Sequence, residues 1–135
     1  MGVGEGMEKT SKISGFRDLR VWQGGMDLVE QVYRLTREFP KHELYGLVGQ
    51  MQRAAVSVPS NIAEGHTRDS SKEYLRHLSI ARASLAELQT QLEIAERLQY
   101  CSSQNFSQLL SQSDTLARQL SALRNALLKA LTPNP

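Results

Sequence analysis

Cysteine and histidine are scarce in this chain of 135 residues, and so are glycine-rich loops. The single cysteine, Cys101, cannot form an internal disulfide, and no secretory signal precedes the rest of the sequence. We therefore expect a cytoplasmic protein in a reducing compartment. No basic residue lies beside Cys101 in sequence, which favours a packing role over a reactive thiol.

The residues that usually support catalysis are also poorly placed. His42, His66 and His77 show neither i, i+4 pairing nor Glu-x-x-His spacing, so a bundle metal centre would lack its ligands. Serines and a glutamate near His66 supply the residue types of a nucleophilic triad, but no strand-turn-helix elbow or glycine-built oxyanion site accompanies them. No P-loop or dinucleotide glycine motif occurs. We predict a non-enzymatic protein with no catalytic residue, no metal and no cofactor.

The stretch from Leu44 to Gly65 is almost free of charge, because Arg53 is the only charged residue before Glu64. Its polar residues argue against a membrane span, since a bilayer penalises each of them. These residues are Gln50, Gln52, Arg53, Ser57, Ser60 and Asn61. We therefore predict a largely buried central helix of a helical bundle, and no membrane association.

Length and composition favour one small domain, with 40% hydrophobic and 22% charged residues. The net charge of +2 neither requires nor excludes a nucleic-acid partner. Residues 1–15 contain four glycines and little apolar content, which predicts a disordered N-terminal tail. We expect a four-helix domain over residues 16–131 and a C-terminal tail over residues 132–135.

The first helix is predicted from about Phe16 to Phe39, where Pro40 ends it. Its apolar residues form two neighbouring stripes with helical spacing. The first stripe contains Leu19, Trp22, Met26, Val29 and Tyr33, and the second contains Val21, Leu28, Val32, Leu35 and Phe39. Two stripes cover a wider arc than one packing partner requires. We therefore predict that copies of the chain associate.

The second helix is predicted to begin near His42 or Glu43 and to end at Glu64, with Gly65 as a left-handed cap. Pro59 lies inside this helix and removes a backbone hydrogen bond. We expect a kink one turn before Pro59, eased by a neighbouring serine hydroxyl.

The third helix is predicted from Ser70 to about Tyr100, because Ser70 and Glu73 fit a capping box. Its core stripe is predicted as Leu78, Ala81, Leu85, Leu88, Leu92 and Ala95. The fourth helix should start after an N-cap at Ser102 or Ser103. Its stripe is predicted as Phe106, Leu109, Ser113, Leu116, Leu120, Leu123, Leu127 and Ala130.

Only a few residues separate successive helices, around Pro40, residues 65–69 and residues 101–103. Short connections make consecutive helices antiparallel neighbours. The sequence therefore predicts an all-α, up-down-up-down antiparallel four-helix bundle.

Three charged residues are candidates for structural ion pairs. Arg53 and Glu64 lie 11 residues apart, which is about three helical turns and places them on one face. Each needs a partner if it is buried. Glu87 on the third helix is the candidate partner for Arg53, either within one subunit or between two.

Cationic residues form two short stripes with helical spacing. The first consists of Arg34, Arg37 and Lys41, and the second consists of Arg68, Lys72 and Arg76. Interspersed carboxylates favour an ordinary solvated face in a single monomer. A ring would instead repeat each stripe around its rim and could follow a phosphate backbone. Tyr74 could stack on a base, but a core role fits its spacing better.

Four segments resemble the four-helix-bundle proteins encoded in bacterial 23S rRNA intervening sequences. They are FRDLRVW, YRLTREFP, ELYGLVGQMQRAAVSVPSNIAEG and SLAELQTQLEIA. The resemblance covers roughly Phe16 to Tyr100 and is most specific over residues 54–65. Gln52 stands where an arginine is common in that family, Ala83 where glycine is common and Gln89 where glutamate is common.

The resemblance implies a homopentameric ring and kinship with the accessory variability proteins of diversity-generating retroelements. Those proteins bind a reverse transcriptase and nucleic acid. We therefore expect a non-enzymatic, homo-oligomeric accessory factor that binds nucleic acid, RNA foremost, or that joins a ribonucleoprotein and assists a reverse transcriptase. The alternative is a protein-binding scaffold without direct contact to nucleic acid.

Overall fold

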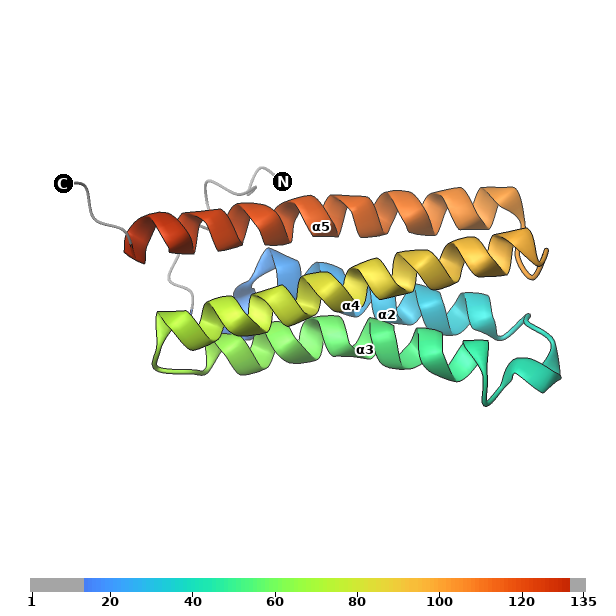
Figure 1. Ribbon diagram of the computed structural model, residues 1–135, viewed down its shortest axis with the longest axis horizontal. Coiled ribbons are helices and arrows are strands. Elements are labelled where there is room, and N and C mark those ends of the chain that lie inside the picture. Colours follow the sequence, from blue (N-terminus) through green and yellow to red (C-terminus); the bar gives the residue numbers. More distant parts are fainter. Residues whose placement is uncertain (1–13, 132–135) are drawn as a thin grey trace.

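Four long helices lie side by side along the long axis of the molecule (Figure 1). The computed structural model describes residues 14–131. The helices are α2 (Arg20–Thr36), α3 (Leu47–His66), α4 (Ser71–Arg97) and α5 (Ser103–Leu131), with short 3-10 turns η1 (Phe16–Asp18) and η2 (Lys41–Glu43). No strand occurs within residues 14–131, so the all-α class is confirmed. Most of the predicted N-terminal tail and all of the C-terminal tail lie outside the described residues.

The core stripe predicted for α4 is confirmed, because every member from Leu78 to Ala95 is almost fully buried. Residues of α5 join this core less deeply. Leu109, Ser113, Leu116 and Leu120 are buried, whereas Phe106, Leu123 and Leu127 are half-buried and Ala130 is exposed. The predicted stripe of α5 is therefore confirmed in its first half. Its C-terminal part lies nearer to solvent.

The two apolar stripes of the first helix have different roles. The second stripe, from Val21 to Phe39, faces the core, whereas Met26 and Tyr33 of the first stripe remain 42% and 43% exposed. The helix itself is shorter than predicted. Leu19 is extended and separates η1 from α2, while Ser14 bonds the Asp18 carboxylate through its N–H and its hydroxyl.

The start of α3 also differs from the prediction, because Gly46 adopts a non-helical conformation between η2 and α3. Glu43 then caps α3, since its Oε1 accepts the N–H of Leu47 at 3.0 Å. The same carboxylate accepts the Tyr100 hydroxyl at 2.8 Å. These bonds lower the pKa of Glu43, with the Leu47 bond the larger cause, and the Glu43 bond raises the pKa of Tyr100.

The prediction of Gly65 as a left-handed cap was wrong. No described glycine has positive φ, and Gly65 is a buried residue inside α3, which continues to His66. A Cβ on Gly65 would lie 2.7 Å from the Cβ of His77 and 3.0 Å from Cδ1 of Tyr74. Glycine is therefore required because α4 crosses closely at this point. In the sequence Gly65 resembled a helix cap, because its contact with α4 lies near the end of α3.

Pro59 is buried and α3 continues through it as one helix. Gly25 of α2 makes room for the ring, because a Cβ there would lie 3.2 Å from the Cβ of Pro59. Ser57 has another role than the predicted relief of Pro59. Its hydroxyl pairs with that of Ser84 at 2.8 Å and accepts Nδ2 of Asn61 at 3.0 Å.

Polar side chains therefore connect α3 to α4 along one seam. Asn61 also donates to the Ser57 carbonyl at 2.9 Å, and its Oδ1 lies 3.0 Å from Nδ1 of the buried His77. We name Ser57, Asn61, His77 and Ser84 the α3–α4 polar row. Each of these four side chains has a hydrogen-bond partner among the other three, as polar groups between packed helices require.

The predicted N-caps of α4 and α5 are confirmed, because a serine hydroxyl accepts a backbone N–H at the start of each helix. Ser70 accepts the N–H of Glu73 at 3.3 Å, and Ser102 accepts the N–H of Asn105 at 3.0 Å. The Glu73 carboxylate lies 3.9 Å from Arg68, so an ion pair takes the place of the reciprocal half of the capping box.

Candidate nucleic-acid interface

The first predicted basic stripe lies where α2 ends. Arg34 is on α2, Arg37 follows its last residue and Lys41 opens η2. All three side chains are exposed. Glu30 and Glu38 lie one turn on either side of Arg34, so this stripe carries mixed charge.

The second predicted stripe lies at the start of α4. Lys72 and Arg76 occupy its first two turns and are exposed. Arg68 lies in the connection that precedes α4, which begins after the Ser70 cap, so only Lys72 and Arg76 of this stripe share a helix. Glu73 partly neutralises Arg68 at 3.9 Å, whereas no ion pair of Lys72 or Arg76 is present within residues 14–131.

The structure does not bring the two stripes together. The connection from α2 to α3 lies at one end of the bundle, and the connection from α3 to α4 lies at the other (Figure 1). The 20 residues of α3 separate them, which corresponds to about 30 Å at the usual helical rise. One chain therefore offers two separate small basic areas.

Sequence reasoning missed further cations near the second stripe. The C-terminal part of α5 lies at the same end of the bundle as the start of α4, and it carries Arg124 and Lys129 (Figure 1). Helix α2 begins in this half of the molecule with Arg20. We name Arg68, Lys72, Arg76, Arg124 and Lys129 the basic end. No spacing along one helix reveals it, because its members come from two helices and a connection.

Tyr74 points into the bundle, so the core role expected from its spacing is confirmed. It packs against the main core, and its ring meets that of His66 edge-on at a centroid distance of 5.7 Å. Burial raises the pKa of Tyr74 to about 12. The ring is therefore poorly placed to stack on a base.

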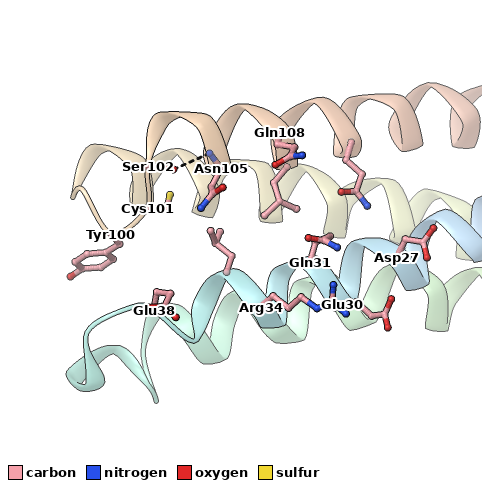
Figure 2. A pocket seen from close by; sticks show the side chains of 13 residues that line it. Asp27, Glu30, Gln31, Arg34, Glu38, Tyr100, Cys101, Ser102, Asn105 and Gln108 are labelled. Carbon is pink, nitrogen blue, oxygen red and sulfur yellow. Dashed lines mark hydrogen bonds between the residues drawn. The ribbon is translucent and has the colours of Figure 1, made fainter.

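A groove of about 680 Å³ separates α2 from α5 (Figure 2). Asp27 and Gln31 of α2 and Asn105 of α5 extend into this space, while Glu30 and Arg34 lie along its α2 edge. Asp27, Glu30 and Glu38 form no ion pair or hydrogen bond with another described residue. We name this space the α2–α5 groove; its lining carries three carboxylates and one guanidinium.

The three residues predicted as structural polar groups are all exposed. Arg53 and Glu64 lie on the outer face of α3, and Glu87 lies on α4, where it accepts Nε2 of Gln91 at 3.3 Å. No ion pair joins them within the described chain. The expected pair within one subunit is therefore absent, because α3 turns this face away from the core. A pair between subunits stays a prediction.

A protein-family model for the 23S rRNA-intervening sequence protein matches residues 17–122. That span begins in η1 and reaches most of the way along α5, so it covers the four-helix fold. The chain belongs to the 23S rRNA-intervening sequence protein family. A search of the curated proteins finds no match.

The family match includes both predicted stripes, whereas Arg124 and Lys129 of the basic end lie beyond it. Residues 14–131 contain no group of three or more His, Cys, Asp or Glu side chains suited to hold a metal. They also contain no helix that is both long and apolar enough to cross a bilayer. Burial, followed by the charge of Glu96, raises the pKa of the Cys101 thiol and disfavours its reactive thiolate.

Proposed function

We propose that this member of the 23S rRNA-intervening sequence protein family is a non-enzymatic RNA-binding accessory protein that acts as a homo-oligomer. The fold in this proposal is an up-down-up-down bundle, and copies of it form a pentameric ring. The observation that carries the proposal is the basic end: two helices and one connection that together carry five cations lie at the same end of the bundle. The family description, which names an rRNA element, supports RNA as the nucleic acid.

The two predicted stripes contribute unequally in this proposal. Arg34, Arg37 and Lys41 share their end of the bundle with Glu30 and Glu38, so carboxylates weaken the local potential there. The basic end also contains two carboxylates, Asp69 and Glu73, but it carries five cations against the three of the α2 stripe. Phosphate binding grows with the number of cations that displace counterions. RNA therefore meets the basic end first and the α2 stripe second.

Self-association is part of the proposal because one basic end is small. A handful of cations gives weak binding at physiological salt, whereas several copies on one RNA act together. Exposed apolar side chains of α2 support this association: Met26 and Tyr33 are more than two-fifths exposed in the single chain.

The test is a salt titration of RNA binding by the full chain, wild type against Lys72→Glu/Arg76→Glu. Phosphate contacts make log affinity fall linearly with log salt, with a slope of about 0.7 per contact on single strands. The double variant should bind more weakly at low salt and lose about 1.4 units of slope for each engaged chain. Oligomer mass and helicity should not change, because both side chains are exposed.

Arg82→Glu/Arg97→Glu is the matched control, since it reverses two exposed cations elsewhere on α4. Arg37→Glu/Lys41→Glu should have an intermediate effect. If the wild-type chain does not bind RNA at about 50 mM salt, the low end for phosphate-dominated binding, the proposal fails. It also fails if Lys72→Glu/Arg76→Glu binds as tightly as the parent.

The second candidate function is a scaffold that binds another protein without touching nucleic acid. The outer face of α3 favours it, because uncharged residues such as Gly49 and Val56 surround its one cation, Arg53. A reverse transcriptase of a diversity-generating retroelement is the partner that the family resemblance implies. Co-purification of such an enzyme with a chain that fails the RNA test would favour this candidate.

A further inference from the structure

The outer surface of α2 and α3 is apolar at its centre and is uncovered in the single chain. Met26 and Tyr33 of α2 and Val56 of α3 are each about two-fifths exposed. A shallow hollow of about 380 Å³ lies between Tyr33, Gly49, Arg53 and Val56. We name Met26, Tyr33, Gly49, Arg53 and Val56 the α2–α3 face.

Arg53 is the cation of this face. Its guanidinium lies over Gly49, where an added Cβ would meet Nη1 at 3.1 Å. It forms no ion pair or hydrogen bond with another described residue. A cation without a partner, surrounded by exposed apolar side chains, requires an acidic partner once the face is covered.

The α2–α5 groove has the opposite charge and lies on another side of α2. Asp27, Glu30 and Glu38 line it without partners of their own, beside the guanidinium of Arg34, and the apolar lining residues Leu35 and Leu109 are almost fully buried. Helix α2 therefore presents apolar side chains toward α3 and carboxylates toward α5. The α2–α3 face carries one cation, Arg53, whereas the groove carries three carboxylates against one guanidinium, so the two surfaces have opposite net charge.

We propose that the α2–α3 face of one copy docks on the α2–α5 groove of the next copy, with Arg53 meeting the groove carboxylates. The proposal rests on the self-association in the proposed function and identifies its two surfaces. Two different surfaces make a heterologous contact, which closes a ring when the rotation per copy divides a full turn. A face-to-face contact would instead pair each copy with one partner only.

The experiment uses two variants of the full chain and measures mass by light scattering at micromolar concentration. Arg53→Glu/Val56→Glu disables the face, and Asp27→Arg/Glu30→Arg disables the groove. Each variant alone should fall from the oligomer mass to the 15.1 kDa monomer. Circular dichroism should stay unchanged because all four side chains are exposed. Arg82→Glu/Glu93→Arg on α4 is the matched control and should keep the oligomer mass.

Mixing the two variants gives the decisive result. The groove-disabled chain keeps an intact face and the face-disabled chain keeps an intact groove, so they should form a one-to-one complex and nothing larger. The proposal is overturned if either variant keeps the parental mass or if the mixture stays monomeric. The proposal is also overturned if adding Glu64→Arg to Arg53→Glu restores the oligomer mass, because that result indicates contact between two α3 helices.

These outcomes separate the docking geometry from the proposed function. If the parent is an oligomer and both variants keep its mass, the docking geometry is overturned, but RNA binding and self-association stay in place. A monomeric parent overturns the geometry together with the self-association on which it rests. The RNA titration addresses a different surface and is read independently.

Discussion

The seam between α3 and α4 and the seam between α2 and α5 differ sharply in how closely the helices approach. On the first, small side chains such as Gly65, Ser57 and Ser84 allow direct contact and hydrogen bonds between the helices. On the second, long polar side chains such as Gln31 and Gln108 line a groove of about 680 Å³. Close packing excludes a ligand or partner, whereas the open seam keeps its polar groups available for one.

The largest expected effect tests the closely packed core of α4. Ala95 is fully buried, so Ala95→Asp places an unpaired charge in that core and should cost about 3–5 kcal/mol of unfolding free energy. Chemical denaturation measures the loss. Ala83→Asp, at an exposed position of the same helix, is the control and should change stability by less than about 0.5 kcal/mol. Equal effects of the two variants would show that the buried stripe is misplaced.

A pair of glycine substitutions compares the two seams directly. Gly65→Ala gains about 1 kcal/mol of helix propensity but overpacks the α3–α4 crossing, which typically costs about 1–3 kcal/mol. We expect net destabilisation, because the new Cβ would lie 2.7 Å from that of His77. Gly24→Ala should stabilise by up to about 1 kcal/mol, since its nearest neighbour across the seam with α5 is Leu116 Cδ1 at 3.4 Å. Melting temperatures that shift in the same direction would contradict the contrast.

The α3–α4 polar row gives an effect of similar size. Asn61→Ala removes the partner of Nδ1 of the buried His77 and should cost about 1–3 kcal/mol. Asn105 lines the open groove and its side chain is exposed, so Asn105→Ala should change stability by less than about 0.5 kcal/mol. Urea titrations of both variants test this. If Asn61→Ala leaves the unfolding free energy unchanged, water reaches the α3–α4 polar row and replaces the lost hydrogen bonds.

The smallest effect concerns Glu43, which ties the start of α3 to Tyr100 beside the groove. Its pKa is lowered in the folded state from an ordinary 4.5, first by the Leu47 N–H and then by Tyr100. Its contribution is therefore fully present above that ordinary value and is lost as pH falls through the lower folded pKa. The stability difference between the wild type and Glu43→Gln should shrink to nothing on acidification. A difference independent of pH between 7 and about 3 would exclude this role.

Periodicity was enough to find the four helices and the α4 core, because a 3.6-residue repeat records which side of a helix is apolar. It was less informative for the first helix, where two stripes competed. Val21, Leu28 and Val32 face the core, whereas Met26 and Tyr33 face outward. Both stripes satisfy the same spacing. Only contact with the other helices decides which of them is covered.

The candidate interface was predictable to a similar degree. Lys72 and Arg76 stand together on α4 because spacing along one helix fixes their relative position. Arg124 and Lys129 of α5 were missed, since they join the basic end only because the last turns of α5 lie at the same end of the bundle as the first turns of α4, which are far from them in sequence. Arg53 and Glu64 were expected to form ion pairs within one subunit or between two, but their exposure on α3 depends on how this helix packs against the others.

The sequence by itself determined the all-α class, the number of long helices, the serine caps and the face by which α4 enters the core. These features depend on interactions within a few residues, so local order along the chain encodes them. The tertiary structure alone decided the role of Gly65 and the positions of the basic end, the groove and the α2–α3 face. Each of these arises where separate helices meet, and the distance between two helices depends on side chains that no single segment contains.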